Sequence, residues 1–214
     1  MILQAHGSRL TAKAIIIRIN KPCKHNKGKW ETATFCSTQN STLKHKTNKT
    51  EIFAMQVLIM YFSHTGNTKK LAEAIATGVE RVEEVKCLIK TVEEVTTDDF
   101  ASSDGIIAGS PVYFGTMAAE LKELFDKFIG VRRKMENKVG AAFATSADPS
   151  GGKETTMMSI IQAFLIYGMI IVGDPLSATG HYGVACTGAP DKKTAENAAK
   201  LGERVASLVK KLKG

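Results

Sequence analysis

The sequence predicts an α/β fold built on an open, doubly wound parallel sheet of five strands with helices on both faces. Two observations support this fold class. Short, almost entirely apolar runs alternate along the chain with longer stretches in which apolar residues recur every three to four positions. Runs of the first kind are typical of parallel strands that are covered on both faces, and their alternation with helices is typical of connected βαβ units.

The first expected strand is Val-Leu-Ile-Met-Tyr-Phe at residues 57–62, and four similar apolar runs follow it. We expect strands at residues 57–62, 85–89, 105–110, 139–145 and 169–172. In sheets of this kind, ligands bind beyond the carboxyl ends of the strands, at the point where the strand order reverses. The loops expected to carry function are therefore 63–68, 110–115 and 145–152.

Apolar residues at helical spacing predict the helices between and after these strands. The helices are expected around Leu71, Ile75 and Val79; from Met117 through Leu121 and Leu124 to Phe128; from about 152 to 167; and from about 192 to 212. The apolar stretch 157–172 is short for a membrane span and is interrupted by Ser159, Gln162 and Gly168. We interpret it as a helix that ends near Gly168, followed by a buried strand.

Charge is distributed unevenly along the 214 residues. The net charge of +8 would normally suggest a nucleic-acid partner, but the first 54 residues hold ten Lys and Arg against Glu31 and Glu51. Residues 55–214 are left with 19 basic and 19 acidic side chains. A nucleic-acid partner is therefore disfavoured for the main domain. Four scattered cysteines argue against a disulfide scaffold and favour a reducing, cytoplasmic location.

Residues 1–54 are expected to form a basic, disordered extension, and residues 55–214 the working domain. The extension has one short apolar run, and its pattern fits neither a sustained helix nor a pair of strands. Three interpretations stay open: an organelle transit peptide, a basic arm for anionic surfaces, or sequence upstream of a true start at Met55. Its cysteines and histidines match no zinc spacing, so no metal site is expected.

The loop after the first strand carries the most chemical information. Ser63-His-Thr-Gly-Asn-Thr68 presents three hydroxyl groups, one glycine and the expected start of a helix together. Free N–H groups at a helix start bind phosphate, and Gly66 lets the backbone approach the oxygens closely. The lysine of nucleotide triphosphatases is missing, so a monoester phosphate is expected rather than a triphosphate. The alternative is that Ser63 and Thr68 only cap a helix.

These residues resemble a known family. Residues 63–68 resemble the FMN phosphate loop of flavodoxins. Residues 109–117 (Gly-Ser-Pro-Val-Tyr-Phe-Gly-Thr-Met) are similar to the flavin-ring loop of the tryptophan-repressor-binding-protein type of NAD(P)H:quinone oxidoreductases, and residues 143–156 resemble that group's third flavin loop. The likeness covers essentially all of 55–214. It implies a flavodoxin-like fold with strand order 2-1-3-4-5 and bound FMN.

The resemblance also implies which residues bind FMN. The first loop would hold the phosphate, the second would run along the ring edge, and the third would close over the pyrimidine side. Tyr113 is the expected stacking residue, and Phe114 either stacks or packs into the core. His181 is a candidate proton donor, with a plain surface role as its alternative. The implied cofactor-binding residues are Ser63, His64, Thr65, Gly66, Asn67, Thr68, Pro111, Val112, Tyr113, Phe114, Gly115, Thr145, Ser146, Ala147, Asp148 and Gly151.

Two functions follow from the resemblance. The first is an FMN-dependent oxidoreductase that takes hydride from NAD(P)H and reduces a quinone or another small acceptor. The second is a flavodoxin that carries single electrons between protein partners. Such carriers are usually acidic, so the charge balance of residues 55–214 favours the enzyme. The compact length and the short link between Ile89 and Asp104 favour the carrier, while Tyr113, where the quinone reductases generally have arginine, is a departure from their quinone site. No membrane partner is expected, and the fold is compatible with a homo-oligomer.

Overall fold

The structure of the protein is a computed structural model that describes residues 55–214. The expectations for residues 1–54, including the domain boundary at Met55, concern a segment outside this range. The strands are β1 (Met55–Tyr61), β2 (Val85–Thr91), β3 (Gly105–Pro111), β4 (Val139–Ser146), β5 (Ile170–Ile171) and β6 (Gly183–Thr187). The helices are α1 (Asn67–Val79), α2 (Thr97–Ser102), α3 (Ala119–Lys127), the 3-10 helix η1 (Phe128–Met135), α4 (Lys153–Ile166) and α5 (Lys192–Lys213).

The strands form one parallel sheet. Their order is β2-β1-β3-β4-β5, which confirms the predicted topology. The central strands β3 and β4 are almost entirely buried, as continuous apolar runs in a sheet covered on both sides require. The chain runs from β1 outward to β2 and then returns to β3 on the other side of β1, so the strand order reverses beside β1.

The fifth position of the sheet is divided between two short strands. β5 pairs Val139 with Ile170 near the start of β4, and β6 pairs Ser146 with Thr187 at its end. The sequence predicted a strand at 169–172 but none at the position of β6. All residues of β4 are buried, and buried backbone groups need partners along the whole strand. β5 is too short to supply them, so a second segment completes the pairing.

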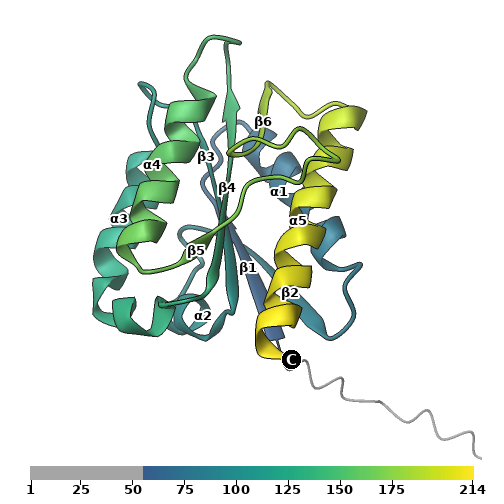
Figure 1. Cartoon of the computed structure of the whole chain (residues 1–214). Helices are drawn as coiled ribbons and strands as arrows, with labels where there is room; N and C mark the ends of the chain where they lie inside the picture. Colours follow the sequence, from purple (N-terminus) through teal and green to yellow (C-terminus); the bar gives the residue numbers. More distant parts are fainter. Residues whose placement is uncertain (1–54) are drawn as a thin grey trace, which may run out of the picture. The chain divides into compact units, whose positions relative to one another are not determined.

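Helices cover both faces of the sheet (Figure 1). α1 and α5 pack together on one face, and α2, α3 and α4 pack on the other. The contact between α1 and α5 depends on two glycines. A Cβ atom on Gly78 would lie 1.8 Å from the carbonyl oxygen of Ala199, and one on Gly202 would lie 2.1 Å from that of Ile75. This close packing fixes α1, whose first turn continues the first predicted loop.

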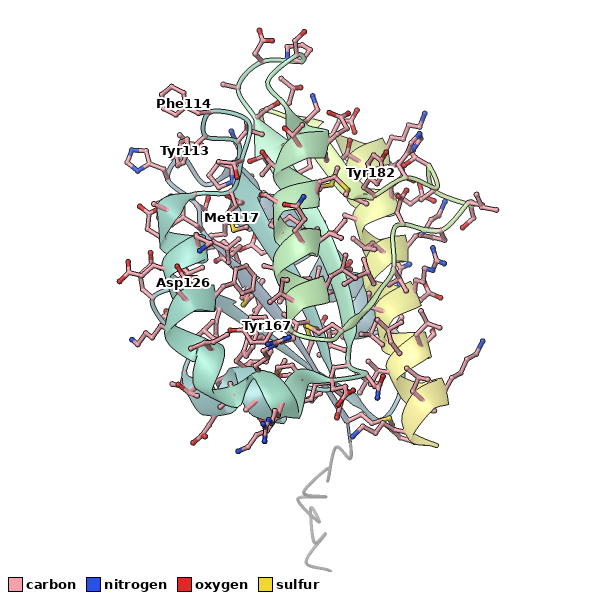
Figure 2. All side chains as sticks on the ribbon, turned by 60° about the vertical axis from the view of Figure 1, so that its left-hand side comes forward. Tyr113, Phe114, Met117, Asp126, Tyr167 and Tyr182 are labelled. Atoms are coloured by element: carbon pink, nitrogen blue, oxygen red, sulfur yellow. The ribbon has the colours of Figure 1, made fainter. Side chains whose placement is uncertain are left out.

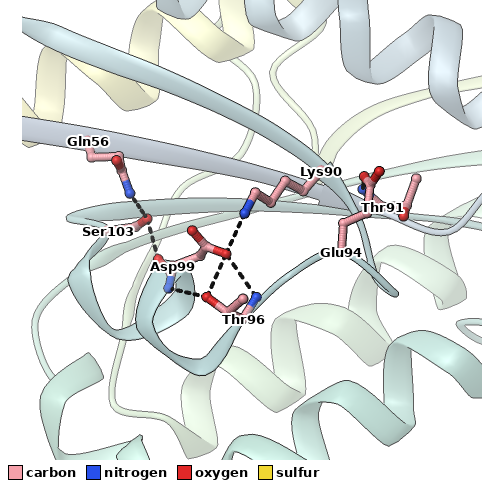
Figure 3. A network of polar contacts seen from close by, with 7 residues as sticks. All are labelled: Gln56, Lys90, Thr91, Glu94, Thr96, Asp99 and Ser103. Atoms are coloured by element: carbon pink, nitrogen blue, oxygen red, sulfur yellow. Dashed lines mark hydrogen bonds and ion pairs between the residues drawn. The ribbon is translucent and has the colours of Figure 1, made fainter.

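The link between β2 and β3 contains α2, a short helix that the sequence analysis did not predict. The Asp99 N–H donates to Thr96 Oγ1 over 3.1 Å, and the Thr96 N–H donates to the Asp99 carboxylate over 2.9 Å. Lys90 on β2 donates to the same carboxylate over 2.7 Å (Figure 3). This reciprocal cap and ion pair close the link with few residues.

The long apolar stretch 157–172 has the predicted order of helix, turn and strand, but the prediction of a buried strand is wrong: Ile170 is 42% exposed and Ile171 is half-buried, because β5 lies at the edge of the sheet. The stretch comprises most of α4, a turn at Gly168 with a left-handed φ of 77°, and β5. Tyr167 and Met169 on either side of this turn are buried. Within residues 55–214, no helix combines the length and the apolar character that a bilayer crossing requires.

Candidate functional site

The three predicted loops leave the same edge of the sheet from neighbouring strands. They follow β1, β3 and β4, beside the point where the strand order reverses. Backbone hydrogen bonds join them where they start: the Phe62 N–H donates to the Gly109 carbonyl over 3.2 Å, and the Val112 N–H donates to the Thr145 carbonyl over 2.8 Å. The loops are therefore held together at the edge where open α/β sheets bind ligands.

The first loop is organised by one hydroxyl oxygen. Ser63 Oγ accepts the N–H of Gly66 over 3.2 Å and the N–H of Lys69 over 3.3 Å. Gly66 itself has a left-handed φ of 86°, and a Cβ atom there would meet nothing within 4 Å. Since both lone-pair directions of the Ser63 oxygen are engaged, its O–H hydrogen is left to donate toward a ligand.

The remaining N–H groups of this loop have no acceptor within residues 55–214. They belong to His64, Thr65, Asn67 and Thr68. The first turn of α1 contains no acidic residue, and the two lysines that follow Thr68 are exposed. The loop therefore presents donors and no carboxylate. A phosphate monoester has only acceptor oxygens at neutral pH, so these residues fit the phosphate of FMN.

Thr68 is buried at the base of this loop. Its Oγ1 lies 2.8 Å from Oγ1 of Thr145, which is near the end of β4. The two side chains are 2% and 4% exposed. The alternative interpretation is that Ser63 and Thr68 only cap the helix. Ser63 does accept an N–H group of the first turn, but the Thr68 hydroxyl bonds to Thr145 on β4 rather than to its own helix. This contact links the first and third loops.

The second loop is a tight reverse turn that displays an aromatic side chain. Tyr113 and Thr116 exchange two backbone hydrogen bonds of 3.1 Å each, and the two residues between them have positive φ angles of 51° for Phe114 and 77° for Gly115. Positive φ at a bulky residue is unfavourable. The turn projects the Phe114 ring away from the protein (Figure 2), and the side chain is fully exposed. The interpretation of Phe114 as a core residue is therefore wrong.

Tyr113 lies closer to the body of the protein than Phe114. Its side chain is 40% exposed, and its ring makes an edge contact with Phe62 at a centroid distance of 6.3 Å. Figure 2 shows the Phe114 ring farther out from the protein than Tyr113. Phe62 ends the first expected strand and was not predicted as a site residue. In the sequence, Phe62 is the last residue of an apolar run, which predicts only a buried strand. Its contact with Tyr113 is visible only in the folded structure.

Two serines that the sequence analysis did not single out fix the second loop. Ser110 Oγ donates to the Pro111 carbonyl over 2.7 Å and accepts the Ala118 N–H over 2.8 Å. Ser159 of α4 accepts the Met117 N–H over 3.1 Å. Such long-range partners of a loop backbone have no local sequence signal. They hold the turn firmly even though its tip is exposed.

The third loop is closed by hydrogen bonds to Asp148. Ser146 Oγ donates to the Asp148 carbonyl over 2.7 Å, and the Gly151 N–H donates to the same oxygen over 3.0 Å. Ala147 and Asp148 are exposed, whereas Thr145 and Ser146 are buried. Lys153 Nζ bonds to the Pro149 carbonyl over 2.8 Å and to Thr187 Oγ1 on β6 over 3.2 Å. The loop is thus tied to the neighbouring strand.

The second and third loops meet at their glycines. Gly152 has a left-handed φ of 90°, and a Cβ atom on it would lie 3.2 Å from Cα of Gly115. It would also lie 2.9 Å from Oγ1 of Thr155. The backbone of the aromatic turn therefore approaches the start of α4 closely.

His181 lies in the segment between β5 and β6. Its side chain is exposed, and its N–H donates to Asp174 Oδ1 over 2.8 Å. The buried Asp174 carboxylate also accepts hydrogen bonds from Thr179 and Gly180. Burial alone would raise the pKa of Asp174, but these hydrogen bonds, led by the Thr179 hydroxyl, hold it below its usual 3.8. In residues 55–214 no hydrogen bond connects His181 with the three loops, and its role as a proton donor stays a prediction.

Tyr167 lies far from the aromatic turn, near the opposite end of α4 (Figure 2). Its hydroxyl donates to the Phe125 carbonyl over 2.6 Å, and the side chain is buried. Burial, with a smaller contribution from the nearby Asp126, raises the pKa of Tyr167 to about 12. A hollow of about 720 Å³ opens beside it, lined by Ile129, Arg133 and Gly168 among others. None of the three loops contributes to this hollow.

Comparison with known proteins agrees with this geometry. The sequence pattern of the family described as NADPH-dependent FMN reductase matches residues 55–183, a range that includes all three loops. An NAD(P)H dehydrogenase (quinone) from Archaeoglobus fulgidus is 35% identical over 188 residues, covering 73% of this chain and 98% of the relative. A flavodoxin from Aquifex aeolicus is 34% identical over 160 residues, covering 72% of this chain and 86% of the relative.

A solved structure supports the same fold. The flavodoxin, WrbA-like protein from Agrobacterium tumefaciens superposes with a TM-score of 0.64 at 23% identity, covering 74% of this chain and 99% of its own. Together with the observed strand order, this similarity confirms the flavodoxin-like fold that the resemblance implied.

Proposed function

The chain belongs to the NADPH-dependent FMN reductase family, and from that premise we propose that it passes hydride equivalents from NAD(P)H through FMN to a quinone or another small acceptor. The family match and the relatives confirm the coarser prediction of an FMN-dependent oxidoreductase that uses NAD(P)H. Bound FMN supplies the hydride and electron chemistry, while the residues of this chain bind and orient it.

The donor-rich first loop carries the proposal. Ser63, the free N–H groups and Thr68 would bind the FMN phosphate. Pro111 to Gly115 would follow the ring edge, with Tyr113 as the stacking side chain. Residues 145–151 would close over the pyrimidine side, because Gly152, which follows them, approaches Gly115 of the aromatic turn closely.

A small planar acceptor fits the surface around the second loop. The exposed Phe114 ring gives a quinone an apolar plane to contact. The alternative is a one-electron carrier with a redox protein as its partner. The similarity to the Aquifex flavodoxin and the short link between β2 and β3 support that alternative.

The thiols support a cytoplasmic location. Cys87 and Cys186 are both unpaired. Burial raises the pKa of Cys87 to about 12 and that of Cys186 to about 11, with smaller contributions from nearby acidic groups. Both thiols therefore stay protonated and unreactive, as expected of structural cysteines in a reducing compartment.

A visible spectrum tests the proposed function. The full chain is loaded with FMN, freed of excess flavin, and treated with NADH or NADPH without oxygen. We expect the flavin to bleach within seconds and to regain its colour when a quinone is added. A flavin that stays oxidised until dithionite is added would establish the carrier instead.

A matched pair of variants shows whether the signal comes from the proposed site. Gly66→Glu introduces a negative charge into the first loop. Gly130→Glu makes the same change at an exposed glycine of η1 with open space around it. Only the first variant should lose the flavin spectrum and the NAD(P)H response.

A further inference from the structure

The hydroxyl groups of Thr68 and Thr145 form an isolated buried pair. Thr68 lies in the first turn of α1 and Thr145 near the end of β4, 77 residues apart in the sequence. Their oxygens are 2.8 Å apart. Within residues 55–214, neither hydroxyl has another hydrogen-bond partner. This isolated hydrogen bond links the first loop to the third loop.

The hydrogen bond between the two hydroxyls leaves one of their two hydrogens without an acceptor. Each hydroxyl has one hydrogen, and a single bond between them engages only one of the two. If Thr68 donated to Thr145, Thr68 would turn lone pairs toward the first loop and repel a phosphate oxygen. If Thr145 donates to Thr68, the hydrogen of Thr68 is free to point toward the loop. A bound phosphate, which only accepts, favours the second direction.

Ser63, at the start of the first loop, also has a hydroxyl whose oxygen accepts hydrogen bonds from the protein. Its oxygen accepts the N–H groups of Gly66 and Lys69, so its own hydrogen is directed outward. For Ser63 the orienting donors are backbone groups of the loop itself. For Thr68 the orienting donor comes from a different strand. Both hydroxyls would then act as donors to one anion.

We propose that Thr145 orients the Thr68 hydroxyl toward the phosphate and so makes the protein select FMN over riboflavin. This assignment rests on the proposed function and deepens it, since it gives Thr145 a role at the phosphate rather than at the flavin ring. Thr145 is a positioning residue, because it acts through Thr68 and is itself 4% exposed. Its carbonyl also accepts the Val112 N–H, so the same residue joins all three loops.

The test measures the dissociation constants of FMN and riboflavin for the full-chain apoprotein by flavin fluorescence quenching. We expect Thr145→Val to weaken FMN binding about five- to tenfold and to change riboflavin binding less than about twofold. Thr145→Ser keeps the donor and should restore the preference for FMN. The matched control is Ser103→Ala, which removes a fully buried hydroxyl from the link between β2 and β3, outside the three loops, and should leave both affinities unchanged.

A double-mutant cycle identifies the path of the effect. Once Thr68→Val has removed the oriented hydroxyl, adding Thr145→Val should cost no further FMN affinity. Additive losses would overturn the proposal, as would equal weakening of FMN and riboflavin or no change in either. Should valine prevent folding, Thr145→Ala removes the hydroxyl without adding an atom and should give the same loss. A wild-type protein that binds neither flavin would refute the proposed function itself, whereas normal FMN binding with an unchanged ratio refutes only the role of Thr145.

Discussion

Two segments of the protein are each organised around one side chain, and they differ in which backbone N–H groups they leave without an acceptor. In the first loop, Ser63 accepts two N–H groups and several others stay without an acceptor. In the segment between β5 and β6, the Asp174 carboxylate accepts the N–H groups of Thr179, Gly180 and His181. Arg204 further bonds to the carbonyls of Gly173 and Asp174.

This difference separates the loop that we propose to bind phosphate from a structural one. A buried carboxylate that satisfies its surrounding donors stabilises the fold and has nothing left for a ligand. A neutral hydroxyl that fixes the loop while other donors remain free prepares a site for an acceptor-only group. The pattern of unsatisfied donors, rather than the presence of polar residues, distinguishes the loop that we propose to bind phosphate.

The strongest test of this comparison places a charge in the first loop. Gly66→Glu adds a carboxylate at the position of the phosphate and a side chain where φ is 86°. We expect FMN affinity to fall at least about a hundredfold, because like charges in contact cost several kcal/mol. Flavin retained on a size-exclusion column measures this. Gly66→Ala introduces the strain without the charge and should retain most of the FMN; a fully yellow Gly66→Glu protein would contradict the phosphate assignment.

The converse change removes the charge from the structural loop. Asp174→Asn should lower the free energy of unfolding at pH 7 by about 2 kcal/mol and leave FMN affinity within about threefold. Because the folded-state pKa of Asp174 lies below 3.8, its contribution is present above that pH and is lost as the pH falls through the folded-state pKa. Urea unfolding of both proteins should therefore converge in strong acid.

The control for Asp174→Asn is Asp126→Asn, which breaks an exposed ion pair with Lys122. Such pairs contribute little, so the loss should stay below about 0.5 kcal/mol. If Asp174→Asn abolished FMN binding without lowering stability, the contrast between the two loops would not hold.

A smaller effect is expected at the stacking residue. Tyr113→Ala should weaken FMN binding about tenfold and shift the midpoint potential of the flavin, since a stacked aromatic contributes to affinity and sets the environment of the ring. Spectroelectrochemistry and fluorescence titration measure the two quantities. Tyr182→Ala, in the segment between β5 and β6, is the matched control. Identical affinity and potential in Tyr113→Ala would remove Tyr113 from the flavin contact.

The smallest effect is expected at the tip of the aromatic turn. Phe114→Gly relieves a positive φ of 51° and should raise stability by about 0.5 kcal/mol after the entropic cost of glycine. FMN affinity should stay within about twofold because the backbone keeps its path, while the KM for a quinone should rise severalfold. Thermal unfolding and steady-state kinetics test this. A loss of FMN would place the Phe114 ring against the flavin instead.

Local patterns predicted most of the fold, since the five apolar runs and the helical spacing of Leu71, Ile75 and Val79 are decided by neighbours in the sequence. They missed α2, although the Thr96–Asp99 pair that caps it is a local signal, and β6, whose short Gly-Val-Ala-Cys-Thr run gains its pairing only from β4. The positions of the functional loops followed from topology. The exposure of Phe114 and the contact between Thr68 and Thr145 depend on distant segments and were beyond sequence reasoning.

The divided fifth strand position has a consequence for how this molecule can be altered. β5 and β6 each align with β4 through their own pairings, so the length of the segment between them does not set the register of the sheet. The cost of closing a longer loop grows only logarithmically with its length. Leu176 in this segment is 93% exposed. We therefore expect that a peptide tag or a small reporter domain can be inserted at this position without changing the pairing of the strands.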